Sequence, residues 1–334
     1  MGRPGIRGTA LVWGVAVAVL AGCSSENASD TLQTIEPATP ASAPSVAPEA
    51  AGNVRPFDYR VDALIVQPDT GTLVALADDG ARLLLLDDGA AEPRVVDLPA
   101  EAATVVAGRD GTVLAPGSGV VAQVDTTDGA VTEVSVDADA LSAAVLTDGR
   151  WAVGTADGRV LVVAPGTGEV EETISGLAST DLIAVSGDSV AALDRRQTSL
   201  TSVDIEDAHL GAALRAGRGA TQLATDPYGR VLVTDTTGEE LLVYTIDSLI
   251  LRQRYPVGPA PYAVTYDEQR DLVWVTLTGS NEVVGYDLST GTAEERHRFA
   301  TVRQPNSVAV DPADGTLVIA SATGDGLQRI PIEG

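Results

Sequence analysis

Three oxygen-bearing side chains, those of Asp62, Asp181 and Asn306, fall at one equivalent position of a repeated sequence pattern. Carboxylate and amide oxygens that converge on one point are the ligands that Ca²⁺ prefers in proteins. A bound Ca²⁺ could polarise a substrate or activate water, which is the chemistry of a metal-dependent hydrolase or lyase. These three residues are therefore the candidate metal ligands of the chain.

The same position of the pattern also carries residues that cannot bind a metal well. Thr221 and Tyr262 occupy it in two other repeats and could contact a bound small molecule. Ala103 and Leu141 occupy it in the remaining two, and their side chains have no oxygen to offer. A polar ring that binds a metal-free ligand, or only water, is therefore the alternative to a Ca²⁺ centre.

Catalytic motifs are missing elsewhere in the sequence. It contains no G-x-S-x-G nucleophile motif, no H-E-x-x-H zinc motif and no G-x-G-x-x-G loop, and it has no lysine for a Walker motif. The two histidines, His209 and His297, belong to different repeats, so we expect solvated surface side chains rather than a shared centre. Aspartates such as Asp125 and Asp128 lack the spacing and the distal glutamate of an EF-hand loop and indicate turns.

The elements that position the candidate site come from the repeat itself, which starts near Arg55 and has a period of about 40 residues. Clear copies are LATDPYGRVLVTD (Leu223–Asp235) and VAVDPADGTLVIAS (Val308–Ser321), in which two apolar strands flank a turn. Four short strands in about 40 residues are typical of a β-propeller blade. Seven copies predict an all-β, seven-bladed propeller with four strands per blade. The starts of the innermost strands would line the mouth of its central channel, where the candidate residues would meet.

The two ends of the propeller are expected to join. The last repeat has three recognisable strands, and residues near Asn53–Tyr59 could supply the fourth. Such a closure would remove the open edges of the first and last blades.

The segment LVWVTLTGSNEVVGYDLSTG (Leu272–Gly291) combines an apolar strand, a turn with threonine and asparagine, and a second apolar strand that ends in aspartate. It resembles the YVTN-type repeat of YncE-like bacterial β-propellers, most clearly over residues 221–321 and less so over 60–220. The resemblance implies the propeller fold and no particular activity, because propellers host both enzymes and scaffolds. Propeller lactonases use a metal at the channel mouth, with more Glu and Asn ligands than this chain offers.

The only cysteine, Cys23, ends the run Leu20-Ala21-Gly22-Cys23 directly after an apolar segment. Arg3 and Arg7 precede that segment, which is too short to span a bilayer. The pattern looks like the signal peptide and lipobox of bacterial lipoproteins, which implies cleavage before Cys23 and attachment of diacylglycerol and palmitate-like chains. We therefore expect a signal peptide (1–22), a lipidated Cys23 with a disordered Ser/Ala/Pro-rich tether (23–52), and the propeller domain (53–334).

Charge limits the partners. The formal net charge of −26 opposes binding to nucleic acid and direct adsorption to anionic lipid. Arginines nevertheless form small positive islands that could make a binding patch near tyrosines. They are Arg195, Arg196, Arg252, Arg254, Arg296 and Arg298.

Together these features favour a monomeric binding or scaffold module that is lipid-anchored on the extracytoplasmic face of the cell membrane. Its partner would be an envelope protein or glycan, with no nucleic acid and no cofactor unless the ring holds Ca²⁺. The alternative is a metal-dependent hydrolase or lyase with its site at the channel mouth. A haem-dependent role lacks support because the sequence has no C-x-x-C-H motif.

Overall fold

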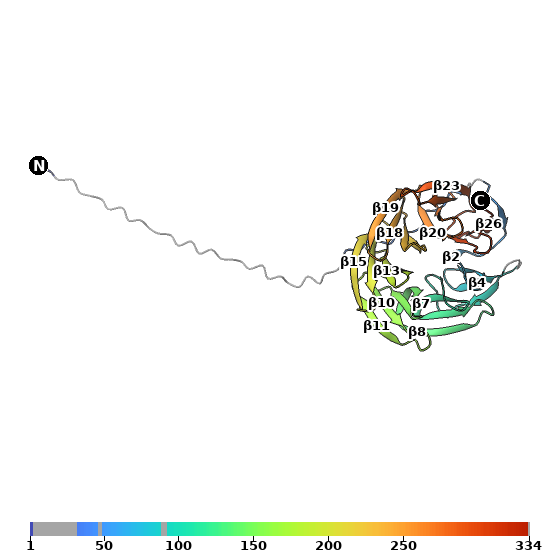
Figure 1. Cartoon of the computed structure of the whole chain (residues 1–334), viewed down its shortest axis with the longest axis horizontal. Helices are drawn as coiled ribbons and strands as arrows, with labels where there is room; N and C mark the ends of the chain where they lie inside the picture. The colour runs from blue at the N-terminus through green and yellow to red at the C-terminus, as the bar shows by residue number, and fades with distance from the viewer. Residues whose placement is uncertain (3–31, 46–48, 88–91, 333–334) are drawn as a thin grey trace. The chain divides into compact units, whose positions relative to one another are not determined.

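A computed structural model describes residues 1–2, 32–45, 49–87 and 92–332 of the chain. By its contacts the chain divides into two compact units, Met1–Leu32 and Gln33–Gly334. The predicted signal peptide, the lipobox and Cys23 lie outside the described residues, apart from Met1 and Gly2. The second unit is a β-propeller, and antiparallel sheets are arranged around its centre (Figure 1).

In the part of the chain that the structure describes, six hydrogen-bonded sheets make up the propeller. The first sheet contains β2 (Val61–Val66), β3 (Leu73–Ala77), β4 (Arg82–Leu86) and β5 (Arg94–Asp97). The second sheet contains β6 (Val106–Ala107), β7 (Thr112–Asp125), β8 (Val131–Val145), β9 (Trp151–Thr155), β10 (Arg159–Val163) and β11 (Val170–Ser175). The next two contain β12 (Leu182–Ser186), β13 (Ser189–Asp194), β14 (Ser199–Asp204) and β15 (His209–Arg215), followed by β16 (Ala220–Thr225), β17 (Arg230–Asp235), β18 (Glu240–Thr245) and β19 (Ile250–Pro256). The last two contain β20 (Pro261–Asp267), β21 (Leu272–Leu277), β22 (Glu282–Asp287) and β23 (Glu294–Ala300), followed by β24 (Ser307–Val310), β25 (Leu317–Ala320), β26 (Leu327–Ile330) and β1 (Asn53–Arg55).

The prediction of seven four-stranded blades is wrong in its count, because the structure has six sheets. The cause lies in β7 and β8, which are 14 and 15 residues long. β7 pairs with β6 near its start and with β8 over its second half, and the end of β8 pairs with β9. Each of these long strands therefore pairs with one neighbour in its first part and with another in its second part, which joins two sequence repeats in one six-stranded sheet.

The closure of the propeller is confirmed. β1 pairs with β26 in antiparallel register, with Val54 opposite Gln328. The first described strand of the chain thus completes the sheet that holds the last three strands, so one sheet joins the two ends of the propeller.

The core lies between neighbouring sheets. Strands in the middle of each sheet are buried over most of their length, as in β3 and β21, whereas outer strands such as β15 and β19 are largely exposed. The apolar side chains form clusters, each of which is shared by neighbouring repeats. This burial explains why the middle strands are apolar and the outer strands carry charge.

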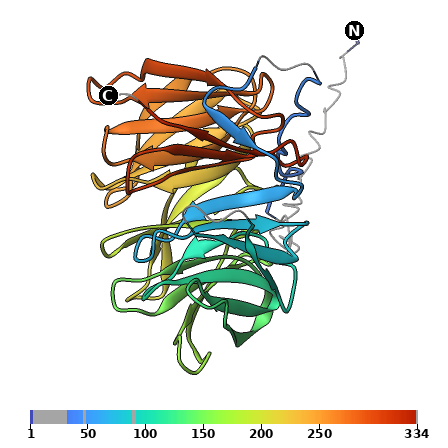
Figure 2. The same ribbon diagram turned by 90° about the vertical axis from the view of Figure 1, so that its right-hand side faces the viewer.

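Described residues of the segment before β1 contact the propeller. The backbone of Ala51 donates to the Ala300 carbonyl, and the buried backbone N–H of Ala43 donates to the Gln304 side chain at 2.9 Å. Blue residues ahead of β1 run along one side of the propeller (Figure 2). The second compact unit begins at Gln33, because polar contacts hold a segment that has little apolar surface to bury.

Candidate functional site

The seven equivalent positions singled out in the sequence all line one central cavity of about 500 Å³. They are Asp62, Ala103, Leu141, Asp181, Thr221, Tyr262 and Asn306. Six of them lie within three residues of the start of an innermost strand, and Leu141 lies in the second half of β8. The repeat thus brings together residues that are spread over 245 residues of sequence between Asp62 and Asn306. All seven repeats reach the cavity even though the strands form six sheets.

Apolar side chains follow this ring along the same strands. They include Leu64, Val105, Ile183, Leu223, Val264 and Val308, all of which line the cavity. Their side chains pack in the apolar clusters between neighbouring sheets, so the accessible lining of the cavity is mainly polar and suits a ligand with hydrogen-bonding groups.

Several oxygens of the ring take part in hydrogen bonds within the protein. Asp181 Oδ2 accepts from the Ser179 hydroxyl and from the Arg195 backbone N–H at 2.8 Å. Asn306 Oδ1 accepts from Gln304 Nε2 at 2.9 Å, which leaves the Asn306 amide N–H groups to face a ligand. The hydroxyl of Thr221 lies 2.7 Å from that of Thr236. These hydrogen bonds orient the side chains of the ring and use part of the accepting capacity of their oxygens.

Asp62 differs from its neighbours in the ring. It is half-buried, and its Oδ2 is a buried oxygen without a hydrogen-bond partner. Burial, and then the negative charge of Asp79, raise the pKa of the Asp62 carboxyl, although the backbone N–H groups of Gly80 and Asp79 oppose this shift. The ionised carboxylate is thus held in an environment that favours its protonated form.

We expect Asp62→Asn to raise the free energy of unfolding at pH 7. The raised pKa means that the folded chain binds this proton more tightly than the unfolded chain, so the wild type loses stability as the pH rises through the pKa of the folded state. The gain from the substitution should disappear near pH 4, roughly where unfolded aspartates are protonated. Urea unfolding at both pH values measures it, with the exposed Asp58→Asn as control. An equal gain at both pH values would contradict the pKa shift.

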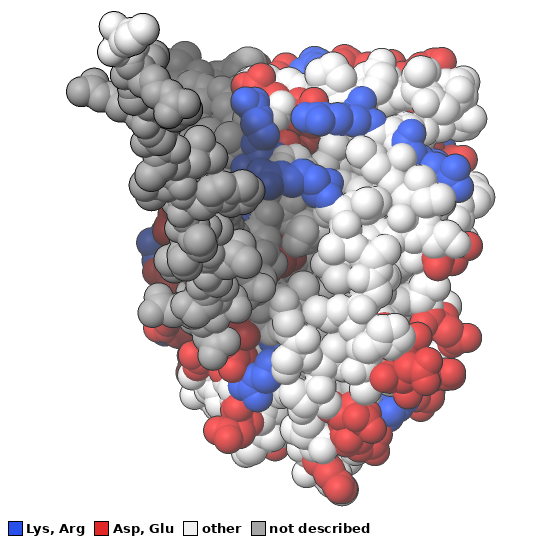
Figure 3. Space-filling view, turned by 90° about the vertical axis from the view of Figure 1, so that its left-hand side faces the viewer, with Lys and Arg blue, Asp and Glu red and all other residues white. Residues whose placement is uncertain are grey.

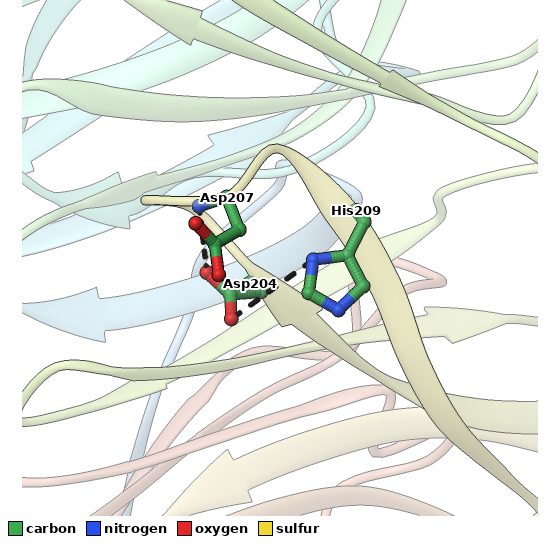
Figure 4. Close-up of side chains that lie close together, drawn as sticks. All are labelled: Asp204, Asp207 and His209. Atoms are coloured by element: carbon green, nitrogen blue, oxygen red, sulfur yellow. Dashed lines mark hydrogen bonds and ion pairs between the residues drawn. The ribbon is translucent and has the colours of Figure 1, made fainter.

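Among the described residues, one other group of side chains could hold a metal, formed by Asp204, Asp207 and His209 at the turn from β14 to β15 (Figure 4). All three are exposed, and His209 Nδ1 lies 4.0 Å from Asp204 Oδ2. Solvated side chains on one turn do not form a preorganised centre. His297 lies in another sheet, on β23, where its ring stacks on Trp274 at 5.7 Å, and neither histidine lines the central cavity.

The outer-strand arginines are mostly paired. Figure 3 shows arginines over the upper part of one side of the propeller and most of the acidic residues of that side over its lower part. Arg254 pairs with Glu240 at 2.6 Å, Arg296 with Asp287 at 2.7 Å, and Arg298 contacts Glu295 at 2.8 Å. These contacts neutralise much of the predicted positive patch. Arg195 differs, because it lines the central cavity.

Sequence reasoning missed Gln304, which is central to the rim of the mouth. Its side chain is nearly buried and connects Asn306 with Ala41 and Ala43 of the segment before β1. In the sequence, only its position two residues before Asn306 points to Gln304, and the repeat pattern gives no reason to expect a hydrogen-bond partner of Asn306 there.

Comparison with known proteins identifies the fold. No protein-family model and no curated protein matches the sequence. A hydrazine synthase structure from Kuenenia stuttgartiensis superposes with a TM-score of 0.70 at 14% identity, covering 86% of this chain and 98% of that chain. A streptogramin B lyase gives 0.68 at 12% identity, with 84% and 96% covered. A catalytically inactive histidine variant of virginiamycin B lyase from Staphylococcus aureus, with quinupristin, gives 0.70 at 13% identity, with 85% and 100% covered. These likenesses show a β-propeller fold.

Proposed function

We propose that this protein is a binding module of the cell envelope whose ligand site is the mouth of the central cavity. The observation that carries the proposal is a central cavity of about 500 Å³ with a polar ring at its mouth. That volume is within the range of small-molecule sites in proteins. The ring offers hydrogen-bonding groups but no activated nucleophile, which favours binding over turnover. The ligand is a polar small molecule or an exposed group of an envelope protein or glycan.

The anchor is part of this proposal. The run Leu20–Cys23 supports a lipidated Cys23, and the resemblance of Leu272–Gly291 to YVTN-type repeats of bacterial propellers agrees with it. Acyl chains would hold this strongly acidic protein, as a monomer, to the extracytoplasmic face of the cell membrane. In the described part of the chain no helix is long and apolar enough to cross a membrane.

A hydrolase or lyase function has less support. One of the similar structures is described as inactive after loss of a histidine, and both histidines of this chain lie outside the cavity.

Native mass spectrometry of the protein extracted from membranes in mild detergent tests the proposal. We expect a lipid adduct on Cys23 that is absent from Cys23→Ser, and a non-covalent ligand that survives in Cys23→Ser. Ala103→Trp should reduce ligand occupancy at least tenfold because the indole fills the mouth, whereas Ala212→Trp on the exposed strand β15 should not. A ligand retained equally by Ala103→Trp would contradict a site at the mouth, and a stoichiometric metal would favour the hydrolase or lyase.

A further inference from the structure

The segment from Ile35 to Ser45, here called the strap, is bound to the propeller through its main chain. Three side chains from different sheets donate to its carbonyl groups. The Arg195 guanidinium donates to the Ala38 carbonyl, Gln304 Nε2 to Ala41 at 2.9 Å, and Asn281 Nδ2 to Pro44 at 3.1 Å.

The three accepting carbonyls are spaced three residues apart along the strap. A polyproline II helix has three residues per turn and no internal hydrogen bonds, so every third carbonyl faces the same side and is free to accept. The strap sequence IEPATPASAPS contains three prolines, which favour this conformation. Spacing and composition therefore agree on a polyproline II segment that turns one face to the propeller.

The orientation of the Gln304 and Asn281 side-chain amides is fixed by backbone N–H groups, which can donate a hydrogen bond but cannot accept one. The Ala43 backbone N–H can only donate, so the Gln304 atom that it meets at 2.9 Å is the oxygen, and the Gln304 nitrogen must face the Ala41 carbonyl. Likewise Asn281 Oδ1 accepts from the Gln304 backbone N–H at 3.0 Å, which leaves its nitrogen for Pro44. Asn281 and Gln304 are almost fully buried, at 0% and 9% exposed. Fixed donors of this kind make a preorganised surface.

Small residues let the strap approach closely. A β-carbon on Gly219 would lie 2.9 Å from the β-carbon of Ala38, and the Ala43 side chain is buried. Three of the strap positions that contact the propeller, Ala38, Ala41 and Ala43, carry alanine, and Pro44 makes its contact through its carbonyl. This surface therefore recognises main chain and small side chains rather than large anchors.

We infer that Arg195, Asn281 and Gln304 form a binding site for polyproline II peptides rich in Ala and Pro, which this chain fills with its own strap. The site adjoins the mouth, because Arg195 lines the cavity and Gln304 also donates to Asn306. The strap therefore covers the sector of the rim that runs from the β12–β15 sheet to the β24 sheet. The inference goes beyond the proposed function and does not depend on the lipid anchor.

Peptide binding to the full chain tests this inference. In one variant, residues 36–45 are replaced by a Gly/Ser sequence of equal length, which keeps the chain connected but removes the polyproline II preference. The probe is a fluorescent synthetic peptide with the sequence of residues 33–46. We expect the peptide to bind this variant at least tenfold more tightly than the wild type, because the tethered strap competes at an effective concentration in the millimolar range. Failure to bind the folded variant would overturn the inference.

Two controls distinguish specific binding at this site from nonspecific binding of the peptide. Gln304→Met in the Gly/Ser variant should weaken peptide binding roughly tenfold, because it removes the two hydrogen bonds that the Gln304 side chain makes to Ala41 and Ala43 and changes the side-chain volume little. A peptide with one glycine inserted after Pro40 should bind as weakly, because the carbonyl register is lost. Equal binding in either control would contradict recognition of the main chain.

Amide hydrogen exchange gives a readout that does not need the Gly/Ser variant. In the wild type the Ala43 N–H should exchange at least tenfold more slowly than that of the exposed Ser42, and Gln304→Met should remove the difference. Gln304→Glu should retain much of the protection, because a carboxylate still accepts from Ala43. Fast exchange of Ala43 in the wild type would overturn the inference.

Discussion

Trp274→Ala is expected to lower the free energy of unfolding by about 3–5 kcal/mol, the range measured when large aromatic core residues are truncated. Trp274 is fully buried on β21, in the apolar cluster that also contains Leu317 and Ile330 from the closing sheet. Its ring stacks near Phe299 at 6.1 Å. Truncation therefore empties a large volume between two sheets, one of which holds both ends of the propeller.

The indole N–H adds a polar part to this loss. Trp274 Nε1 donates to Asp267 Oδ2 at 3.3 Å, and Asp267 is itself buried with Arg270 at 3.2 Å. Without the indole, the buried Asp267 carboxylate loses one hydrogen-bond donor and keeps Arg270 as its charged partner. Urea unfolding at pH 7 measures the total effect, and Trp274→Phe should lose less because it keeps most of the buried area.

Gly285 supplies a matched test of this packing. It pairs with Trp274 across β21 and β22, and a β-carbon there would lie 2.8 Å from the indole ring. Gly285→Ala should therefore destabilise the wild type but not the Trp274→Ala variant, which gives a coupling energy of about 1–3 kcal/mol in a double-mutant cycle. Additive effects would show that the indole does not fill this space.

The ring at the mouth could be predicted because it depends on a local rule repeated along the chain. Each repeat places one residue at the start of an innermost strand, so aligning turns was enough to bring Asp62, Asp181 and Asn306 to one cavity. The closure by β1 followed from the same counting, since the last repeat lacked a strand.

The count of sheets and the strap could not be predicted in this way. Whether two repeats share one sheet depends on how far β7 and β8 continue their pairing, which the turn pattern does not encode. The strap is held by contacts such as Ala43 to Gln304, which are 261 residues apart in sequence. Composition indicates only that Ser, Ala and Pro bury little apolar surface. It does not indicate that the side-chain amides of Asn281 and Gln304 donate hydrogen bonds to the carbonyl groups of the strap.

Asp235→Ala is expected to lower the free energy of unfolding by about 2–4 kcal/mol, because it removes one acceptor from several backbone donors. Asp235 ends β17 and is fully buried. Its Oδ1 accepts from the N–H groups of Gly219 and Gly238, and its Oδ2 from that of Arg218, all at 2.8 Å. Alanine leaves these three donors without a protein partner, whereas Asp235→Asn keeps one acceptor oxygen and should lose roughly half as much.

Asp194 at the end of β13 provides the matched comparison, since it accepts from the backbone N–H groups of Ala178 and Gln197 at 2.7 and 2.8 Å. If these aspartates act alike, Asp194→Ala should cost about as much in urea unfolding at pH 7. The Asp235 substitution should also loosen the strap, because Gly219 packs against Ala38, and thereby speed amide exchange at Ala43. A loss below about 1 kcal/mol for Asp235→Ala would mean that water replaces the carboxylate. The buried position of the Gly219 N–H argues against that outcome, because solvent has little access to it.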